Sequence, residues 1–339
     1  YLGYAARPDL PAHGGGSASG DVPDALWMRP SRLRLFDHPA SDAASDAASD
    51  AAARSGPGSP APPGPAVSPP AGYAAAFAEV QEQLHAGNSY EVNLTYRLDT
   101  LSDVDRVPAY LRLRALNPAP YAGFLQHDVP DARGWLLSSS PERYAVVAAD
   151  RTLETRPIKG TTPRGATPAE DAALRHRLAT EAKFRSENLM IVDLLRNDLA
   201  TVCDPGTVAV PALMRVETYP GVHQLVSTVR GRLRREATAV GALRALFPAG
   251  SMTGAPKLRT MEIIERVEQT PRGAYAGAFG WLAADGRADL GVVIRSLTTT
   301  GDGRYRLGTG GGITVHSQVA EEYAESRWKA ERLLRVFDA

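Results

Sequence analysis

The stretch AYAGAFGWLAADGRADLGVVIRSLTTTGDGRYRLGTGGGI, residues 274–313, contains the clearest signal for the fold class. Its β-branched and aromatic residues predict three strands in succession, over 274–283, 290–298 and 305–307, separated by turns rich in Gly and Asp. Strands that follow one another without a regular βαβ alternation favour an α+β fold built on antiparallel sheet.

The same pattern continues on the N-terminal side of this stretch. Further strands are predicted at Glu91–Leu98, Tyr121–Gln126 and Gly134–Ser139, and several more between Val208 and Leu233. Apolar residues at helical spacing predict helices over residues 74–86, 168–200, 256–268 and 319–337. Helices and runs of strands thus occupy most of the chain from Tyr73 to its end.

The first 72 residues differ from the rest. Residues 1–38 contain two short apolar pieces, Ala25–Met28 and Leu33–Phe36, which we interpret as strands of a remnant of a larger N-terminal unit. Residues 39–72 repeat Ser-Asp-Ala-Ala and continue into a Pro/Gly/Ser tract, a composition typical of a disordered linker. Residues 73–339 are then expected to form one globular domain, and a chain that begins with Tyr1 is expected to lack an upstream part.

Composition excludes several classes of function. The 339 residues include 38 acidic and 38 basic side chains, so no excess of positive charge indicates nucleic-acid binding. No apolar run reaches the ~18 residues of a membrane span, and no signal peptide is visible. The single cysteine, Cys203, excludes a disulfide framework and suits a reducing compartment, so we expect a cytoplasmic protein without membrane or nucleic-acid partners.

Lysine is rare in this chain. Of 38 basic residues only Lys159, Lys183, Lys257 and Lys329 are lysine. Arginine keeps its proton and cannot act as an amine nucleophile, whereas a desolvated lysine can. Lys159, within Arg156-Pro157-Ile158-Lys159-Gly160-Thr161, is therefore a candidate nucleophile, the alternative being an ordinary surface lysine.

Three glutamates could form a metal site. Glu322 and Glu325 lie three residues apart and share one face of the last predicted helix. Glu187 precedes the apolar run Asn188–Leu195, which indicates a buried helix. Carboxylate oxygens are ligands for Mg²⁺. The alternatives are an exposed ion pair from Glu325 to Lys329 and a helix-dipole interaction for Glu187.

Further segments indicate binding or acid–base chemistry. Gly308–Gly312 is predicted to be a glycine-rich turn whose amides could hold an anion. Glu142, after a strand end, could be a general acid or simply exposed. Arg295, inside an apolar strand, needs an anion, either a substrate carboxylate or a structural partner. His223 alternates with apolar strand positions and is by default a core histidine. The segment Gly250–Lys257 lacks the ending of a phosphate loop, so nucleotide binding there is rejected.

Together these segments resemble the chorismate-utilising enzymes, the family of anthranilate synthase component I, isochorismate synthase and salicylate synthase. The resemblance runs in order from about Tyr73 to Ala339. The segments that carry it are Asn88–Thr95, Ser140–Glu142, Pro157–Thr161, Glu187–Asp198, Gly250–Lys257, Met261–Ile264, Gly308–Gly312 and Glu321–Tyr323. The family fold implies two packed antiparallel sheets flanked by helices.

Within the family, Pro-Ile-Lys-Gly-Thr resembles the aminodeoxychorismate synthase component I subgroup, since anthranilate synthases carry Ala at the position of Lys159. Glu187-Asn188 and the segment Pro23–Met28 agree with this subgroup. The resemblance implies that Lys159 attacks C2 of chorismate while Glu142 protonates the departing C4 hydroxyl. Ammonia then adds at C4 and expels the lysine. For this Lys159 must be neutral, so burial is expected to lower its pKa.

The resemblance also implies the remaining site residues. Mg²⁺ is expected on Glu187, Glu322 and Glu325. Substrate contacts are expected from Arg295, Tyr275, Gly310, Gly311, Thr161, Ser251, His223 and Lys329, with Lys257 in the substrate or metal shell. Two residues depart from the pattern of relatives. Phe184 replaces a polar or acidic residue, and Glu91 replaces the Gln or catalytic Lys of some relatives.

Ammonia must come from elsewhere, because Cys203 lacks the Gly-x-Cys-x-Gly setting of a glutaminase nucleophile. We therefore expect a glutamine amidotransferase as a separate subunit or a fused domain. The expected product is 4-amino-4-deoxychorismate, the precursor of p-aminobenzoate. The alternatives are anthranilate synthase component I and a non-catalytic chorismate-binding subunit.

Overall fold

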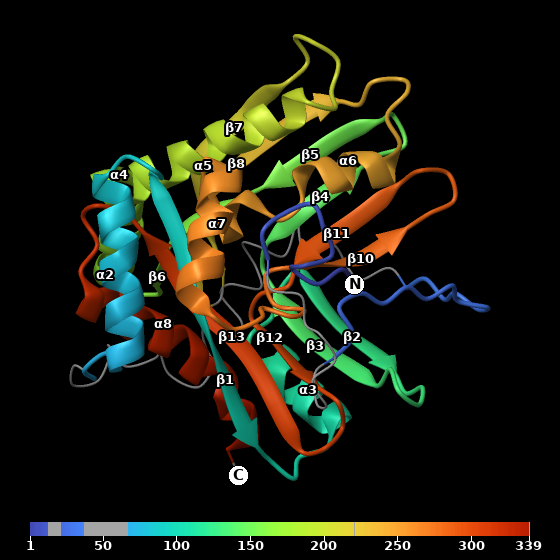
Figure 1. The fold of residues 1–339 in the computed structure, drawn as a ribbon, viewed down its shortest axis with the longest axis horizontal. Coiled ribbons are helices and arrows are strands. Elements are labelled where there is room, and N and C mark those ends of the chain that lie inside the picture. Colours follow the sequence, from blue (N-terminus) through green and yellow to red (C-terminus); the bar gives the residue numbers. More distant parts are fainter. Residues whose placement is uncertain (13–21, 37–66, 220, 339) are drawn as a thin grey trace.

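The computed structural model describes residues 1–12, 22–36, 67–219 and 221–338. Two antiparallel sheets form its framework, with seven helices of the described part around them (Figure 1). The α+β class and the two flanked sheets predicted from the sequence are thereby confirmed. No helix in the described ranges is both long and apolar enough to cross a membrane.

The first sheet has six strands. In spatial order they are β2 (Tyr121–His127), β3 (Gly134–Ser140), β12 (Ser296–Thr299), β13 (Arg304–Ile313), β1 (Glu91–Leu101) and β9 (Gly254–Ala255). The second sheet has the order β10 (Ala278–Leu282), β11 (Ala288–Val292), β4 (Arg143–Val147), β5 (Thr152–Arg156), β8 (Val222–Arg232) and β6 (Ile158–Pro163), with β7 (Ala209–Thr218) also paired to β8.

The helices cover these sheets through apolar faces. They are α2 (Ala71–His85), α3 (Arg106–Leu116), α4 (Pro168–Thr180), α5 (Ala182–Ala200), α6 (Ala239–Leu246), α7 (Lys257–Glu268) and α8 (Val319–Leu334). Helix α5 packs on β8 and β6 through the apolar run predicted to be buried, including Ile191, Leu195 and Leu199. Helices α7 and α8 pack on β1 and β13 of the other sheet (Figure 1). Each sheet thus has its own helical cover.

One short segment, between β11 and β12, crosses from the second sheet to the first. The sequence predicts a continuous strand over 290–298, but β11 ends at Val292 in the second sheet and β12 begins at Ser296 in the first. Between them Arg295 adopts a left-handed backbone with φ of 49°, a conformation that few residues other than glycine adopt. The prediction of Arg295 inside a strand is therefore wrong. The chain crosses there from one sheet to the other.

Other predicted elements differ in detail. The Gly308–Gly312 segment is not a turn but the end of β13, where it pairs with β1. The helix predicted over 168–200 is two helices, α4 and α5, separated at Glu181, which has an extended backbone. Neither Ala25–Met28 nor Leu33–Phe36 forms a strand, although Ala25 makes an isolated bridge to Leu2.

The structure describes the C-terminal end of the expected linker, from residue 67 onward. Residues 37–66, most of the predicted linker, lie outside the described residues. Helix α2 begins at Ala71, three residues before the predicted helix start at residue 74. The last two residues assigned to the linker therefore belong to the folded domain.

Candidate active site

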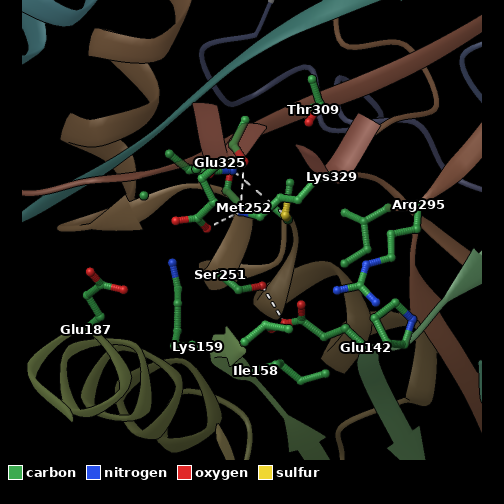
Figure 2. Close-up of a pocket in the computed structure, with 18 of the residues that line it drawn as sticks. Glu142, Ile158, Lys159, Glu187, Ser251, Met252, Arg295, Thr309, Glu325 and Lys329 are labelled. Atoms are coloured by element: carbon green, nitrogen blue, oxygen red, sulfur yellow. Dashed lines mark hydrogen bonds and ion pairs between the residues drawn. The ribbon is translucent and has the colours of Figure 1, made fainter. Parts of the chain in front are cut away.

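A cavity of about 170 Å³ lies between the two sheets, beside the crossover that carries Arg295. Four cationic and four carboxyl side chains line it, drawn from strands, helices and loops of both halves of the fold: Lys159, Lys183, Arg295, Lys329, Glu142, Glu187, Glu322 and Glu325. Figure 2 shows Lys159, Glu142 and Arg295 directed into this space. So dense a set of opposite charges in a partly closed cavity is typical of a site for charged ligands.

Lys159 enters the cavity from β6. The next residue, Gly160, has a φ of 92°, and a side chain there would approach Phe184 within 3.1 Å. The buried Lys159 amine forms an ion pair with Glu91 of β1. Burial lowers the pKa of Lys159, but the carboxylates of Glu91, Glu187 and Glu142 outweigh it, so the pKa lies above its ordinary value. The expectation of a lowered pKa is therefore wrong.

Glu142 follows the end of β3, as the sequence predicts, but it is buried and not exposed. Its Oε1 accepts a hydrogen bond of 2.6 Å from the Ser251 hydroxyl. Burial raises the pKa of Glu142 to about 7, against the opposing effects of Ser251, Lys159 and Arg295. A carboxyl with this pKa can hold and release a proton at neutral pH, which suits a general acid.

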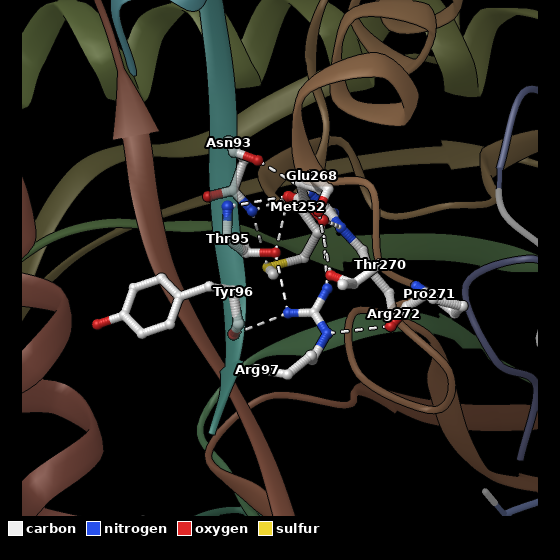
Figure 3. Close-up of polar contacts among 9 residues, drawn as sticks. All are labelled: Asn93, Thr95, Tyr96, Arg97, Met252, Glu268, Thr270, Pro271 and Arg272. Carbon is white, nitrogen blue, oxygen red and sulfur yellow. Dashed lines mark hydrogen bonds and ion pairs between the residues drawn. The ribbon is translucent and has the colours of Figure 1, made fainter. Parts of the chain in front are cut away.

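A buried ion cluster supports the turn that carries Ser251 (Figure 3). Arg272 donates to the Met252 carbonyl at 2.6 Å and to the Asn93 carbonyl at 2.8 Å. Glu268 pairs with Arg272 at 2.6 Å and with Arg97 at 3.2 Å. These bonds join the turn to β1 and to the end of α7. Ser251 is thereby held at a fixed position against Glu142.

Arg295 and Tyr275 provide groups for an anionic ligand. Within the described part of the chain the Arg295 guanidinium makes no hydrogen bond or ion pair, and burial together with Arg332 lowers its pKa to about 10. The Tyr275 ring lies 4.8 Å from the Arg97 guanidinium. Because a partly buried guanidinium favours an anionic partner, Arg295 is suited to bind a carboxylate.

The glycines of β13 form one wall of the cavity. Strand β12 pairs with β13 only at Arg306 and Leu307, so the edge beyond Leu307 faces the cavity. A Cβ atom at Gly308 would lie 2.2 Å from the Tyr275 ring, and one at Gly311 would lie 3.3 Å from Glu322 Oε2. Side chains at these two positions would collide with Tyr275 or crowd Glu322, so glycine suits both.

The three predicted metal ligands lie on this cavity but are engaged differently. Glu187 Oε1 is buried without a hydrogen-bond partner in the described residues, and burial raises the pKa of Glu187 to about 7. Glu322 accepts from Lys183 at 3.1 Å and from Ser317 at 2.8 Å.

Glu325 pairs with Lys329 at 2.7 Å, and this ammonium lowers the pKa of Glu325. The described residues contain no cluster of three acidic or metal-binding side chains already close enough to hold an ion. The unpartnered Glu187 oxygen and the carboxylate chemistry nevertheless fit a hard cation. A cation bound to all three carboxylates would displace Lys183 from Glu322 and Lys329 from Glu325.

The structure places all the predicted site residues around this cavity except His223 and Lys257. His223 on β8 contacts Asp171 and Thr218 at 2.9 Å each, so it is a core histidine and not a substrate ligand. Lys257 pairs with Asp198 at 2.6 Å and donates to the Leu246 carbonyl, away from the cavity. In both cases the carboxylate partner is distant in sequence: Asp171 is 52 residues from His223, and Asp198 is 59 residues from Lys257.

Several lining residues were not predicted. Asn93 and Gln224 line the cavity as polar strand residues, and Lys183 does so from α5. Asn93 lies between the buried residues Val92 and Leu94 on β1. This alternation is that of an ordinary strand and does not identify Asn93 as a site residue. The scarcity of lysine in the chain drew attention to Lys183, but the sequence did not indicate its role.

Comparison with known proteins identifies the family. Residues 1–335 match the family described as chorismate binding enzyme. Aminodeoxychorismate synthase of Streptomyces pristinaespiralis is 43% identical over 98% of this chain and 50% of its own length. Aminodeoxychorismate synthase component 1 of Escherichia coli (strain K12) is 44% identical over 78% of this chain and 57% of its own length.

A solved structure agrees with these matches. Anthranilate synthase component I from Streptococcus pneumoniae TIGR4 superposes with a TM-score of 0.70 at 33% identity, covering 79% of this chain and 58% of that chain. The chain belongs to the chorismate binding enzyme family. It spans about half the length of the curated relatives it matches.

Proposed function

We propose that this chain forms 4-amino-4-deoxychorismate from chorismate and ammonia. The observation that carries the proposal is that the Lys159 amine and the Glu142 carboxyl line one cavity. With a pKa of about 7, Glu142 can donate a proton near neutral pH. The curated relatives named above are called aminodeoxychorismate synthases, which agrees with this reading.

The reaction has two displacements. In the first, the neutral Lys159 amine bonds to C2, the ring double bonds shift, and the C4 hydroxyl leaves as water with the Glu142 proton. In the second, ammonia bonds to C4 and gives a proton to the Glu142 carboxylate. The double bonds shift back and the bond from C2 to Lys159 breaks. Splitting one substitution into two steps through a covalent intermediate is the usual role of a lysine nucleophile.

The substrate carboxylates determine its orientation. Arg295 and Tyr275, with the β13 backbone at Gly310 and Gly311, would hold the enolpyruvyl carboxylate. A guanidinium that has no protein partner binds a carboxylate through two parallel hydrogen bonds. Thr161, Ser251 and Lys329 line the rest of the cavity and would contact the ring and its substituents.

A divalent cation fits the acidic side of the cavity. Glu187, Glu322 and Glu325 would hold Mg²⁺, which would neutralise the ring carboxylate of chorismate. The buried Glu187 oxygen without a partner supports this assignment. When Lys183 and Lys329 leave their glutamates, their ammonium groups become free to face the substrate anion.

Ammonia is the second substrate. The name of the Escherichia coli relative, component 1, refers to one part of a larger enzyme. We propose that a glutamine amidotransferase, as a separate subunit or a fused domain, delivers ammonia to this cavity. The purified chain should then use ammonium salts and not glutamine.

The test is product analysis with chorismate, MgCl₂ and ammonium chloride. The chain should yield a non-aromatic amino product that retains the enolpyruvyl group, identified by mass and absorbance, whereas an anthranilate synthase would yield a fluorescent aromatic product. Lys159→Ala should lose most of this product, and Lys159→Arg should be inactive because a guanidinium stays protonated. Arg196→Ala, on the exposed face of α5, is the matched control. An aromatic product from the unaltered chain would refute the proposal.

A further inference from the structure

Glu91 is the residue that contacts the Lys159 amine. It begins β1, its side chain is 1% exposed, and its Oε1 accepts from Lys159 Nζ. Its second oxygen, Oε2, is buried and has no hydrogen-bond partner in the described residues. A buried carboxylate with one lone partner is costly. The half-satisfied Glu91 therefore calls for a role beyond packing.

The backbone opposite this pair leaves room for it. A Cβ atom at Gly312 on β13 would lie 2.2 Å from Glu91 Oε1 and 3.2 Å from Lys159 Nζ. Three strands, β1, β6 and β13, thus meet around this ion pair. Lys159 lines the cavity, and Glu91 behind it is not one of the lining residues.

The charge state of Lys159 creates a chemical problem. Four carboxyl groups act on it: Glu91 from β1, Glu187 from α5, Glu142 after β3, and Glu325 from α8. Together they keep the resting amine protonated, and an ammonium group has no lone pair with which to attack carbon. The proton must leave before the reaction. Among the described residues, Glu91 is the carboxylate that forms an ion pair with this ammonium.

We propose that Glu91 is the proton acceptor that activates Lys159. The proton moves from Nζ to a Glu91 carboxylate oxygen, which leaves a neutral amine and a neutral carboxylic acid. When ammonia later expels the lysine from C2, Glu91 returns the proton. No proton needs to cross to solvent, and the pair carries no net charge at either stage. The inference rests on the proposed function, in which Lys159 is the nucleophile.

Glu91→Gln tests this, since glutamine keeps the size and an acceptor oxygen but cannot take the proton. With ammonia as donor, kcat at pH 7 should fall by roughly 10²–10⁴-fold with a small change in KM. The rate of the variant relative to that of the unaltered enzyme should then rise about tenfold per pH unit between pH 7 and 9, because ionisation of Glu142 affects both enzymes equally. Glu91→Asp, which keeps a carboxylate, should restore part of the rate and the pH dependence of the unaltered enzyme. Glu262→Gln, on the exposed side of α7, is the control.

A second measurement separates this inference from the proposed function. Labelling of Lys159 by an amine-selective acylating reagent, followed by mass spectrometry, needs no turnover. Glu91→Gln should begin to label at lower pH than the unaltered chain, because the carboxylate that holds the ammonium is gone. If the unaltered chain forms no amino product, the proposed function fails. The labelling would still show whether Glu91 affects the protonation of Lys159. If Glu91→Gln turns over at pH 7 as fast as the unaltered enzyme, or labels with an unchanged pH dependence, Glu91 is not the acceptor.

Discussion

Replacing Glu187 by Gln should stabilise the fold at neutral pH while removing a proposed metal ligand. Burial raises the pKa of Glu187 from 4.5 to about 7. Below pH 4.5 the carboxyl is protonated in both the folded and unfolded chains, and the fold bears no penalty. Between pH 4.5 and about 7 the unfolded carboxyl is ionised while the folded one keeps its proton, so stability falls over this range and levels off above it. At 1.36 kcal/mol per pKa unit, the folded state loses roughly 3 kcal/mol by pH 8.

Gln has no charge to bury, so Glu187→Gln avoids this loss. Urea titrations of both chains at pH 5, 6, 7 and 8 give the free energy of unfolding of each, and the difference between the two measures this loss. The free energy of unfolding of Glu187→Gln minus that of the unaltered chain should increase with pH, by up to roughly 3 kcal/mol between pH 4.5 and 8. Glu321→Gln, exposed on α8, should stay within about 0.5 kcal/mol throughout. A difference that is constant with pH would refute the argument.

The same variant tests the proposed cation site without an activity assay. A ligand at 100 times its Kd stabilises the folded state by about 2.7 kcal/mol. The unaltered chain should therefore show a higher melting temperature in saturating MgCl₂, and Glu187→Gln should show a much smaller rise. An equal rise in both chains would exclude Glu187 as a ligand.

Two further predictions concern the substrate side of the cavity. Ser251→Ala removes the hydrogen bond that stabilises the Glu142 carboxylate, and a bond to a charged group is worth about 1.5–3 kcal/mol. The pKa of Glu142 should rise by one unit or more, moving the alkaline limb of the pH profile of kcat/KM upward; an unmoved limb would argue against Glu142 as the acid. Arg295→Gln should raise KM for chorismate by roughly 10–100-fold, with a smaller effect on kcat, and an unchanged KM would remove Arg295 from the carboxylate site.

The elements that the sequence predicted were those with a strong local pattern. The buried helix after Glu187 and the strands at 121–126 and 134–139 have enough apolar residues to be recognised locally. Strands β5 and β6 were not predicted, because Thr152–Arg156 and Ile158–Pro163 are short and mostly polar or contain Gly and Pro. The candidate nucleophile therefore lay on a strand that local periodicity does not reveal.

The crossover at Arg295 shows a different limit. The run from Gly291 to Leu297 is apolar on both sides of the break, since β11 and β12 are each buried in their own sheet. Nothing local indicates that the two halves of one apolar run belong to different sheets. A left-handed backbone at an arginine is also not expected from its residue type. Tertiary packing alone decides this geometry, and it determines where the guanidinium points.

For the site, residue types could be predicted but charge states could not. The rarity of lysine identified Lys159, and burial alone would have lowered its pKa. Its partner Glu91 is 68 residues away, and the Glu142–Ser251 bond joins residues 109 apart. Such pairs depend on strand register and sheet order, so the protonation of each group follows from the fold and not from its neighbours in sequence.

The charges of the cavity side chains balance one another. Lys183 and Lys329 pair with Glu322 and Glu325, and Glu91 pairs with Lys159. Under the proposed function, a cation on the glutamates would release two ammonium groups just where a dianionic substrate arrives. Its positive charge would also oppose the carboxylates that hold Lys159 protonated, which favours transfer of the proton to Glu91. Cation binding, substrate binding and activation of the nucleophile would then be coupled through one set of side chains, so each should depend on the others.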